Sequence, residues 1–165
     1  MNLSAHQFHD PGLVDLIDAL LTRSGLAPER LVIEITESSM LLNVGETMSA
    51  MERLSAMGVG FALDDFGTGY SSLSYLALLH PTIIKIDQSF VSPSGESVRN
   101  DTLLEAIISL GQKLGMTMSA EGIETRAQFE RLRRLGCDLG QGYLWSPAVA
   151  GDQVDALLTR VNLQS

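Results

Sequence analysis

The sequence has little positive charge, one cysteine and no long apolar run. Its 11 Lys and Arg residues are outnumbered by 20 Asp and Glu residues, which gives a net charge of −9. An acidic chain is poorly suited to bind a long nucleic acid, because such polymers are held through basic surfaces. A small anionic ligand stays compatible with this charge if bound metal ions supply positive charge locally.

The scarcity of cysteine and of long apolar runs also indicates a compartment. Cys137 alone cannot form an internal disulfide, and it fits a reducing cytoplasm. No apolar run approaches the roughly 20 residues of a membrane span, and the start of the chain lacks the features of a secretion signal. At 165 residues and 45% apolar residues, the sequence predicts a cytoplasmic α/β protein with one core.

A short apolar strand, a polar turn and an amphipathic helix recur six times along the chain. The expected strands are Asn2–Leu3 as a strand end, then Leu31–Ile35, a strand beginning at Phe61–Leu63, Thr82–Ile86, Met116–Ala120 and one around Cys137–Gly142. The helices between them are expected after Asp10 with Pro11 at the first position, around Val44–Leu54, over Ser71–Leu79, around Leu103–Leu114, around Phe129–Leu135 and over Asp152–Val161.

Alternation of strands and helices predicts a parallel sheet with right-handed crossovers. Short, wholly apolar strands suit a sheet that is buried on both faces. An open doubly wound sheet and a barrel both satisfy this pattern. The Gly67-Thr68-Gly69 turn follows the third strand and lacks the Gly-x-Gly-x-x-Gly spacing, so a dinucleotide-binding fold has little support.

Polar side chains occur at the ends of all six expected strands. In chain order they are Asn2, Glu34, Asp64, Asp65, Lys85, Asp87, Glu121, Glu124 and Gln141. The ends of parallel strands open on one rim, where α/β proteins build their active sites. Six strands that each deliver a polar group to one rim indicate a shared site.

These acidic residues require a compensating positive charge. Counting Glu37, seven carboxylates lie near the rim, and two unit charges about 4 Å apart repel by roughly 4 kcal/mol at an effective dielectric near 20. Either some are protonated or a cation binds among them. Carboxylate and amide oxygens suit Mg²⁺ or Mn²⁺, and adjacent Asp64 and Asp65 would help to hold two ions for attack on a phosphodiester.

A purely structural interpretation competes with this one for each residue taken singly. An acidic residue after a strand is often a helix cap, and Asp65 and Glu124 are both placed for that role. Lys85 fits this interpretation less well. A lysine between isoleucines in a buried strand needs a carboxylate partner or a functional role.

Several segments together resemble the EAL family of cyclic-di-GMP phosphodiesterase domains. They are Asn2-Leu3-Ser4-Ala5, Glu34-Ile35-Thr36-Glu37-Ser38, Asp64-Asp65-Phe66-Gly67-Thr68-Gly69-Tyr70-Ser71-Ser72-Leu73, Lys85-Ile86-Asp87, Ala120-Glu121-Gly122-Ile123-Glu124-Thr125 and Gln141-Gly142-Tyr143-Leu144. Their order and spacing match the family across essentially the whole chain. The resemblance identifies residues 1–165 as the C-terminal portion of an EAL domain.

The resemblance implies a modified eight-stranded α/β barrel that hydrolyses cyclic-di-GMP to the linear dinucleotide with two Mg²⁺ or Mn²⁺ ions. The family's metal ligands match Asn2, Glu34, Asp64 and Asp65, and its catalytic Lys and Glu match Lys85 and Glu121. Residues that match supporting positions are Glu37, Asp87, Glu124 and Gln141. The segment Phe66, Gly67, Thr68, Gly69, Tyr70, Ser71 and Ser72 matches a regulatory loop, anchored by Glu37, that links dimer contacts to the site.

The chain departs from the family in two respects. The segment Trp145-Ser146-Pro147-Ala148-Val149-Ala150 lacks the basic residue and the second proline that often follow at this place in the family. The Glu-Ala-Leu segment, which supplies a metal ligand several tens of residues before the position of Asn2, is absent, and Leu104-Glu105-Ala106-Ile107 is no substitute because it falls within a helix. About two strand–helix units are therefore missing, so we expect an incomplete barrel. The chain is then a fragment, a homodimer subunit or a degenerate module that binds without hydrolysis. The resemblance also implies sensory or GGDEF domains in a longer parent protein.

Overall fold

The structure, a computed structural model, describes residues 1–36, 39, 44–67, 76, 80–91 and 98–162. Its centre is a parallel sheet of β1 (Val32–Thr36), β2 (Gly60–Phe66), β3 (Ile83–Ile86), β4 (Thr117–Ala120) and β5 (Leu139–Gly140), which pair in that order. Spatial order follows chain order without reversal. That order is the winding of a barrel, whereas a doubly wound sheet reverses direction at its centre.

A short extension lies beyond β1, at the edge of the sheet. Asn2 forms an isolated parallel bridge with Glu34. The Leu3 N–H donates to the Glu34 carbonyl at 3.0 Å, and the Glu34 N–H donates to the Met1 carbonyl at 2.8 Å. The expected strand end at Asn2–Leu3 is thus present as a bridge. The other five expected strands are confirmed, each overlapping an observed one.

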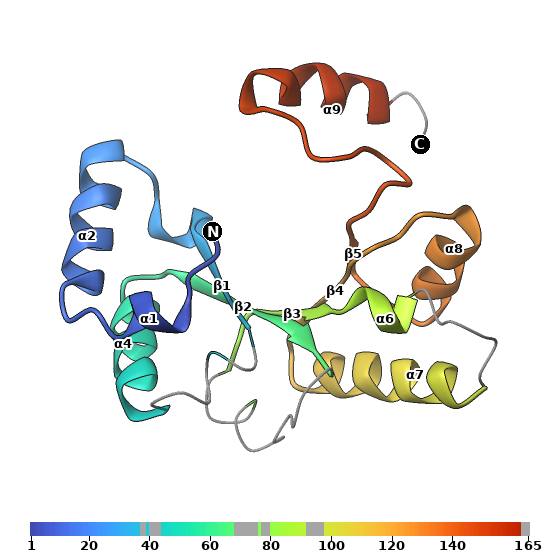
Figure 1. The fold of residues 1–165 in the computed structure, drawn as a ribbon, viewed down its shortest axis with the longest axis horizontal. Helices are drawn as coiled ribbons and strands as arrows, with labels where there is room; N and C mark the ends of the chain where they lie inside the picture. The colour runs from blue at the N-terminus through green and yellow to red at the C-terminus, as the bar shows by residue number, and fades with distance from the viewer. Residues whose placement is uncertain (37–38, 40–43, 68–75, 77–79, 92–97, 163–165) are drawn as a thin grey trace.

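Helices lie at both ends of the sheet (Figure 1). Those near β1 are α1 (Ala5–Phe8), α2 (Leu13–Ser24) and α4 (Val44–Ala56), and those near β4 and β5 are α6 (Gln88–Val91), α7 (Val98–Lys113) and α8 (Arg126–Arg134). Two 3₁₀ turns, η1 (Pro28–Arg30) and η2 (Gly151–Gln153), complete the described elements together with α9 (Val154–Asn162). Figure 1 shows α9 apart from the sheet, after a long connection from β5.

The first long helix begins later than expected. Asp10 caps a turn before the helix, because its Oδ1 accepts a hydrogen bond from the Gly12 N–H at 2.8 Å, and α2 begins at Leu13. The expectation of Pro11 at the first helical position is therefore wrong. The short helix α1 was not expected. It forms because Ser4 and Gln7 make a reciprocal capping box.

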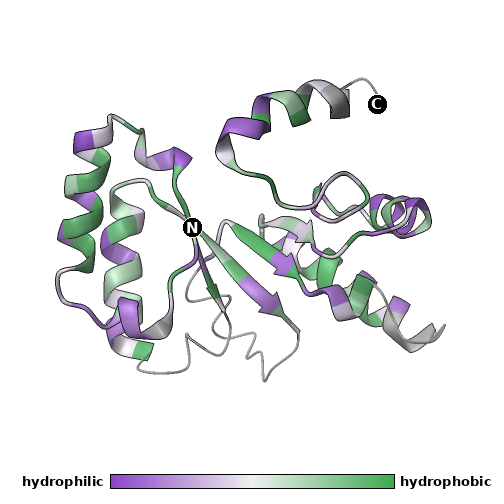
Figure 2. Ribbon diagram, turned by 45° about the horizontal axis from the view of Figure 1, so that its top comes forward, coloured by the Kyte–Doolittle hydropathy of each residue, from purple (hydrophilic) through white to green (hydrophobic). Residues whose placement is uncertain are grey.

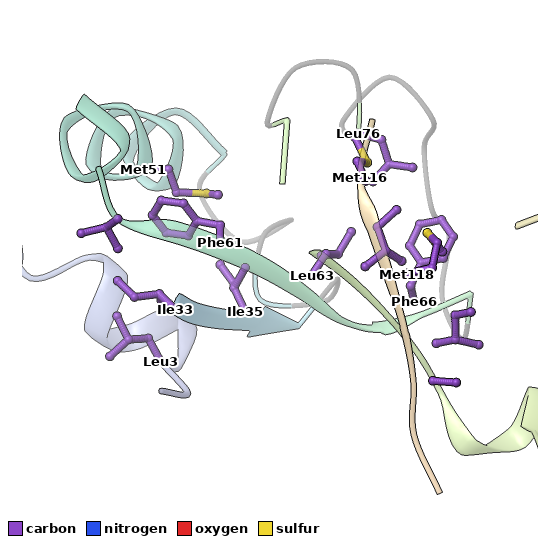
Figure 3. Close-up of a cluster of buried hydrophobic side chains, with 14 of the residues drawn as sticks. Leu3, Ile33, Ile35, Met51, Phe61, Leu63, Phe66, Leu76, Met116 and Met118 are labelled. Carbon is purple, nitrogen blue, oxygen red and sulfur yellow. The ribbon is translucent and has the colours of Figure 1, made fainter. Parts of the chain in front are cut away.

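The core forms where the strand side chains meet the helices. Ile33, Ile35, Phe61, Leu63 and Met118 are buried (Figure 3). Helices α2 and α7 alternate hydrophobic and hydrophilic bands, which is the pattern of helices that cover one side of a core (Figure 2). The expected inward positions of α4 are confirmed most clearly at Met51 and Leu54.

Two further expectations concern the helices over Ser71–Leu79 and Asp152–Val161. The helix expected over Ser71–Leu79 lies outside the described residues except for Leu76, which is helical and buried. The last helix, α9, begins at Val154, two residues after the expected start at Asp152, which lies in η2 instead. Within the described ranges no helix has the length and apolar character that crossing a membrane would require.

Candidate active site

Lys85 lies at the centre of the polar residues that end the strands. Its Nζ is 2.6 Å from Glu34 Oε2, 3.1 Å from Asp64 Oδ1 and 2.5 Å from Glu121 Oε1. Glu34 comes from β1, Asp64 from β2 and Lys85 from β3, while Glu121 directly follows β4. The structure therefore brings together residues 87 positions apart in sequence (34 to 121) around one ammonium group.

The alternation of β3 explains why a lysine occupies this position. Ile84 and Ile86 are buried on one face of the strand, so the residue between them must project from the other face. The Lys85 side chain is only 12% exposed. Its partial burial is tolerated because three carboxylates accept hydrogen bonds from the three N–H groups of its ammonium.

The charges around Lys85 do not cancel. One ammonium and three carboxylates sum to −2. Burial by itself would lower the pKa of Lys85, but hydrogen bonds to Glu121, Glu34 and Asp64 outweigh burial and raise this pKa above its ordinary value. Lys85 is therefore protonated at neutral pH, and the cluster keeps an excess of negative charge that can attract further cations.

Asp65 occupies an unusual backbone conformation at the end of β2. Its φ is 55°, in the left-handed region, and the pairing of β2 with β3 shifts register between Leu63 and Phe66. The Asp65 N–H donates to Asp64 Oδ1 at 3.1 Å. Burial, followed by the charges of Asp64 and Asp87, raises the pKa of Asp65, and Lys85 opposes them. In a regular strand, Asp64 and Asp65 would project from opposite faces of the sheet. The irregularity here lets both of these consecutive residues lie at one site.

A cleft of about 370 Å³ adjoins the Lys85 cluster. The residues that line it are Asp65, Asp87, Gln88, Glu121, Gly122, Glu124, Gln141, Gly142 and Tyr143. The turn after β5 reaches the cleft because the Gln141 N–H donates to the Ala120 carbonyl at 2.8 Å. Three predicted supporting residues, Asp87, Glu124 and Gln141, are thus brought to the same cleft as Asp65 and Glu121.

Asn2 lies at the same rim but is less closely integrated. It pairs with Glu34 through the backbone bridge and is exposed. Within the described part of the chain its side chain makes no hydrogen bond. The bridge places Asn2 beside Glu34, a member of the Lys85 cluster.

The remaining predicted residues fall largely outside the described ranges. Glu37 and the predicted loop residues 68–72 are not among the described residues. Of the loop, Phe66 is buried, and Gly67 has a φ of 95°. A Cβ at Gly67 would lie 2.8 Å from the Phe90 ring, so glycine is required there both for conformation and for space.

The donor set fits a divalent cation. Carboxylate oxygens and one amide oxygen are the hard ligands that Mg²⁺ and Mn²⁺ prefer. In the described ranges, no three His, Cys, Asp or Glu side chains are already arranged around a single metal position. Glu34, Asp64 and Glu121 point instead at the Lys85 ammonium, which shows that their oxygens converge on one cationic centre.

Sequence reasoning did not single out four of the residues that line the cleft, namely Gln88, Gly122, Gly142 and Tyr143. Gln88, Gly122 and Gly142 are each next to a predicted site residue in sequence, and Tyr143 is two positions after Gln141. That proximity is the signal that could have found them. Gly122 has a φ of 67°, and a Cβ there would lie 2.5 Å from Gln88 Cβ. The close approach of these two residues shapes the cleft wall.

Comparison with known proteins connects this geometry to a family. The EAL domain model matches residues 1–148. The bifunctional diguanylate cyclase/cyclic di-GMP phosphodiesterase MucR of Pseudomonas aeruginosa is 43% identical over 154 residues, which cover 93% of this chain and 22% of MucR. The cyclic di-GMP phosphodiesterase NbdA of the same organism is 41% identical over 146 residues, or 88% of this chain and 19% of NbdA.

Solved structures agree with the sequence relatives. The MucR phosphodiesterase in complex with c-di-GMP superposes with a TM-score of 0.87 at 43% identity, over 93% of this chain and 62% of that one. Klebsiella pneumoniae BlrP1 in a manganese and c-di-GMP complex gives a TM-score of 0.82 at 32% identity, over 89% and 38%.

The chain spans about a fifth of the length of MucR and of NbdA. Its five-stranded sheet corresponds to part of the TIM-like barrel of the solved EAL structures, which confirms the expected fold class. The match of the family model covers most of the chain, and so do the relatives and the solved structures. This chain belongs to the EAL domain family.

Proposed function

We propose that this chain carries catalytic residues for the metal-dependent hydrolysis of cyclic-di-GMP to linear pGpG. The observation that supports this most directly is the convergence of Glu34, Asp64 and Glu121 on Lys85 beside an open cleft. MucR and NbdA are named as cyclic di-GMP phosphodiesterases, and the MucR structure is a c-di-GMP complex. Those names support the choice of substrate.

The proposed metal ligands are Asn2, Glu34, Asp64 and Asp65, for two Mg²⁺ or Mn²⁺ ions. Bound ions would lower the pKa of water and offset the negative charge of the phosphodiester. The manganese complex of BlrP1 supports this choice of metal. The excess negative charge of the Lys85 cluster supports it independently, because such a charge attracts divalent cations.

The protein's own acid–base chemistry divides between Lys85 and Glu121. Lys85 cannot accept a proton at neutral pH, because its pKa is raised above its ordinary value. Glu121 can do so, since it borders both the Lys85 ammonium and the cleft. Glu121 is therefore the proposed proton acceptor for the attacking water. Lys85 holds three carboxylates in place and supplies a fixed positive charge beside the attacking oxygen.

Asp87, Glu124 and Gln141 are proposed to orient the substrate from the cleft walls, where the structure has them. We also propose that Glu37 and the segment from Phe66 to Ser72 regulate the site, in a homodimer and within a parent protein that carries sensory or GGDEF domains. The length of MucR and its bifunctional name support further domains. The single half-buried cysteine, Cys137, supports a cytoplasmic location.

The test compares Glu121→Gln with Glu52→Gln, in which the same change is made at an exposed position of α4. Loss of the proton acceptor should lower the rate of pGpG release by on the order of 10²- to 10⁴-fold. The Glu52 variant should match the unmodified protein. Release of pGpG is measured by chromatography with Mg²⁺ or Mn²⁺, for residues 1–165 and for a longer protein that contains them.

We expect weak turnover or none from residues 1–165 alone, so calorimetric binding of cyclic-di-GMP is measured in parallel. Binding without turnover in the longer protein, undisturbed by Glu121→Gln, would favour a binding module over an enzyme. Neither binding nor turnover in the longer protein would refute the proposal as a whole.

A further inference from the structure

The cleft beside the Lys85 cluster is strongly acidic. Four of the described residues that line it carry carboxylates, namely Asp65, Asp87, Glu121 and Glu124. The described lining includes no lysine or arginine. Without bound cations, these carboxylates would repel a phosphate group. Apart from the proposed metal ligand Asp65, the lining is better suited to a neutral group rich in N–H donors, because carboxylate and amide oxygens can accept hydrogen bonds from it.

Tyr143 forms an aromatic wall of this cleft. Its exposed fraction is 73%, the highest of any large hydrophobic side chain among the described residues. Within those residues its side chain makes no hydrogen bond or ring contact. An aromatic ring held in water beside a substrate cleft offers a flat face that the protein's own packing does not use.

The backbone that carries Tyr143 is firmly held. The Ile123 N–H donates to the Gln141 carbonyl at 3.1 Å, and the Leu144 N–H donates to the Ile123 carbonyl at 2.9 Å. A Cβ at Gly142 would lie 2.1 Å from the Ile123 carbonyl oxygen, so this turn lies directly on the backbone after β4.

The residues that follow Tyr143 anchor the turn further. Leu144 packs against the core, and Trp145 meets the Phe129 ring of α8 edge to face, with centroids 5.6 Å apart. Tyr143 is thus exposed on a turn that is anchored on both sides. Its position is preorganised, so that binding a ligand there costs little conformational entropy.

We propose that Tyr143 stacks on a nucleobase of the substrate, and that oxygen acceptors lining the cleft accept hydrogen bonds from the N–H groups along the edge of that base. This proposal rests on the proposed function, because a cyclic dinucleotide supplies both a phosphodiester for the Lys85 cluster and a base for the cleft. Guanine fits the walls well. Its edge carries N–H donors, and Glu124, Gln88 and Gln141 offer acceptors that have no other hydrogen-bond partner through their side chains among the described residues.

The test measures cyclic-di-GMP affinity in the presence of Mn²⁺ for Tyr143→Ala and Tyr143→Phe. Stacking of an aromatic ring on a base contributes about 1–3 kcal/mol, so Tyr143→Ala should weaken binding by about 5- to 150-fold. Tyr143→Phe keeps the ring and should bind within about twofold of the unmodified protein. Leu158→Ala is the matched control, because it removes an exposed apolar side chain from α9, away from the cleft.

A second readout separates stacking from a structural effect. The guanine H8 resonance should move upfield on binding through the ring current of Tyr143, and this shift should persist in Tyr143→Phe and disappear in Tyr143→Ala. Unchanged affinity and an unchanged H8 shift in Tyr143→Ala would overturn the proposal. If cyclic-di-GMP still bound and Glu121→Gln still blocked turnover, only the base-stacking role would fail. Absence of binding by the unmodified protein would refute the proposed function and, with it, this role.

Discussion

Lys85 is one of only two lysines in the chain, and its surroundings differ sharply from those of the other. Lys113 is exposed near the end of α7, whereas Lys85 is half-buried among Glu34, Asp64 and Glu121. A buried ion cluster contributes little net stability when complete, but removal of one partner leaves uncompensated charge. The two lysines therefore provide an internal comparison of one substitution at two sites.

Lys85→Met should destabilise the metal-free protein by on the order of 2 kcal/mol, less than the loss for a fully buried pair because the carboxylates keep some exposure to water. Lys113→Met should change the free energy of unfolding by less than about 0.5 kcal/mol. Urea denaturation of both variants measures the difference. The gap between them should narrow in acid, where the carboxylates become neutral. Equal losses in the two variants would mean that the ammonium does not hold the cluster together.

The strand ends are the part of the site that the sequence predicts well. Glu34, Asp64 and Glu121 share a rim because parallel strands all end at one edge of a sheet, and that follows from topology alone. The contact of Lys85 with all three depends on side-chain geometry, which the pattern could only suggest. The periodicity of the sequence does not predict that Tyr143 lines the cleft. It lies in a turn, where no strand-like alternation sets the direction of a side chain.

At the scale of elements, the turn after β5 is the most tightly constrained segment of the cleft. Gly142 has no space for a side chain, since a Cβ would meet the O, N and C atoms of Ile123 at 2.1, 2.3 and 2.6 Å. Those contacts are backbone atoms and cannot move aside as the end of a flexible side chain can. The turn therefore depends on glycine for close approach.

Gly142→Ala should separate the turn from β4 and displace Gln141 and Tyr143 from the cleft. We expect a loss of about 1–3 kcal/mol of stability, the usual cost of overpacking, together with weakened binding of cyclic-di-GMP. Gly151→Ala is the control, because no atom lies within 4 Å of a Cβ at that position. Thermal unfolding and calorimetry would measure both effects. A Gly142→Ala protein as stable as the control would show that the backbone approach is not a constraint.

The boundaries of elements were predictable to different degrees. Apolar runs bounded the strands closely, as at Thr82–Ile86 against the observed Ile83–Ile86. The cap at Asp10 and the proline at Pro11 predict a helix start there, whereas Asp10 Oδ1 accepts a hydrogen bond from the Gly12 N–H in a preceding turn and α2 begins at Leu13. Local side-chain bonds of this kind compete with helix formation, and spacing alone does not reveal which prevails.

At the scale of the whole molecule, stability is unevenly distributed. The buried residues concentrate on β1–β4 and the helices that cover them, including Ile33, Ile84, Leu104 and Met118. At the other extreme, α9 lies apart from the sheet in Figure 1. The family model ends at residue 148, before α9 begins. The core of the domain and the candidate site therefore lie together, and α9 is peripheral to both.

This distribution predicts a gradient in amide hydrogen exchange. A helix of nine residues is below the roughly 12–15 residues at which isolated helices become even marginally stable, and Val154 and Leu158 of α9 are 38% and 55% exposed. Amides of α9 should therefore exchange by local opening, orders of magnitude faster than those of β2 and β3, which should exchange only on global unfolding. Removal of residues 149–165 should leave the exchange of β2 and β3 unchanged, because the residues of the hydrophobic core all lie before residue 149. Protection of α9 equal to that of the strands would instead require that α9 be docked on the core as an integral part of the cooperative unit.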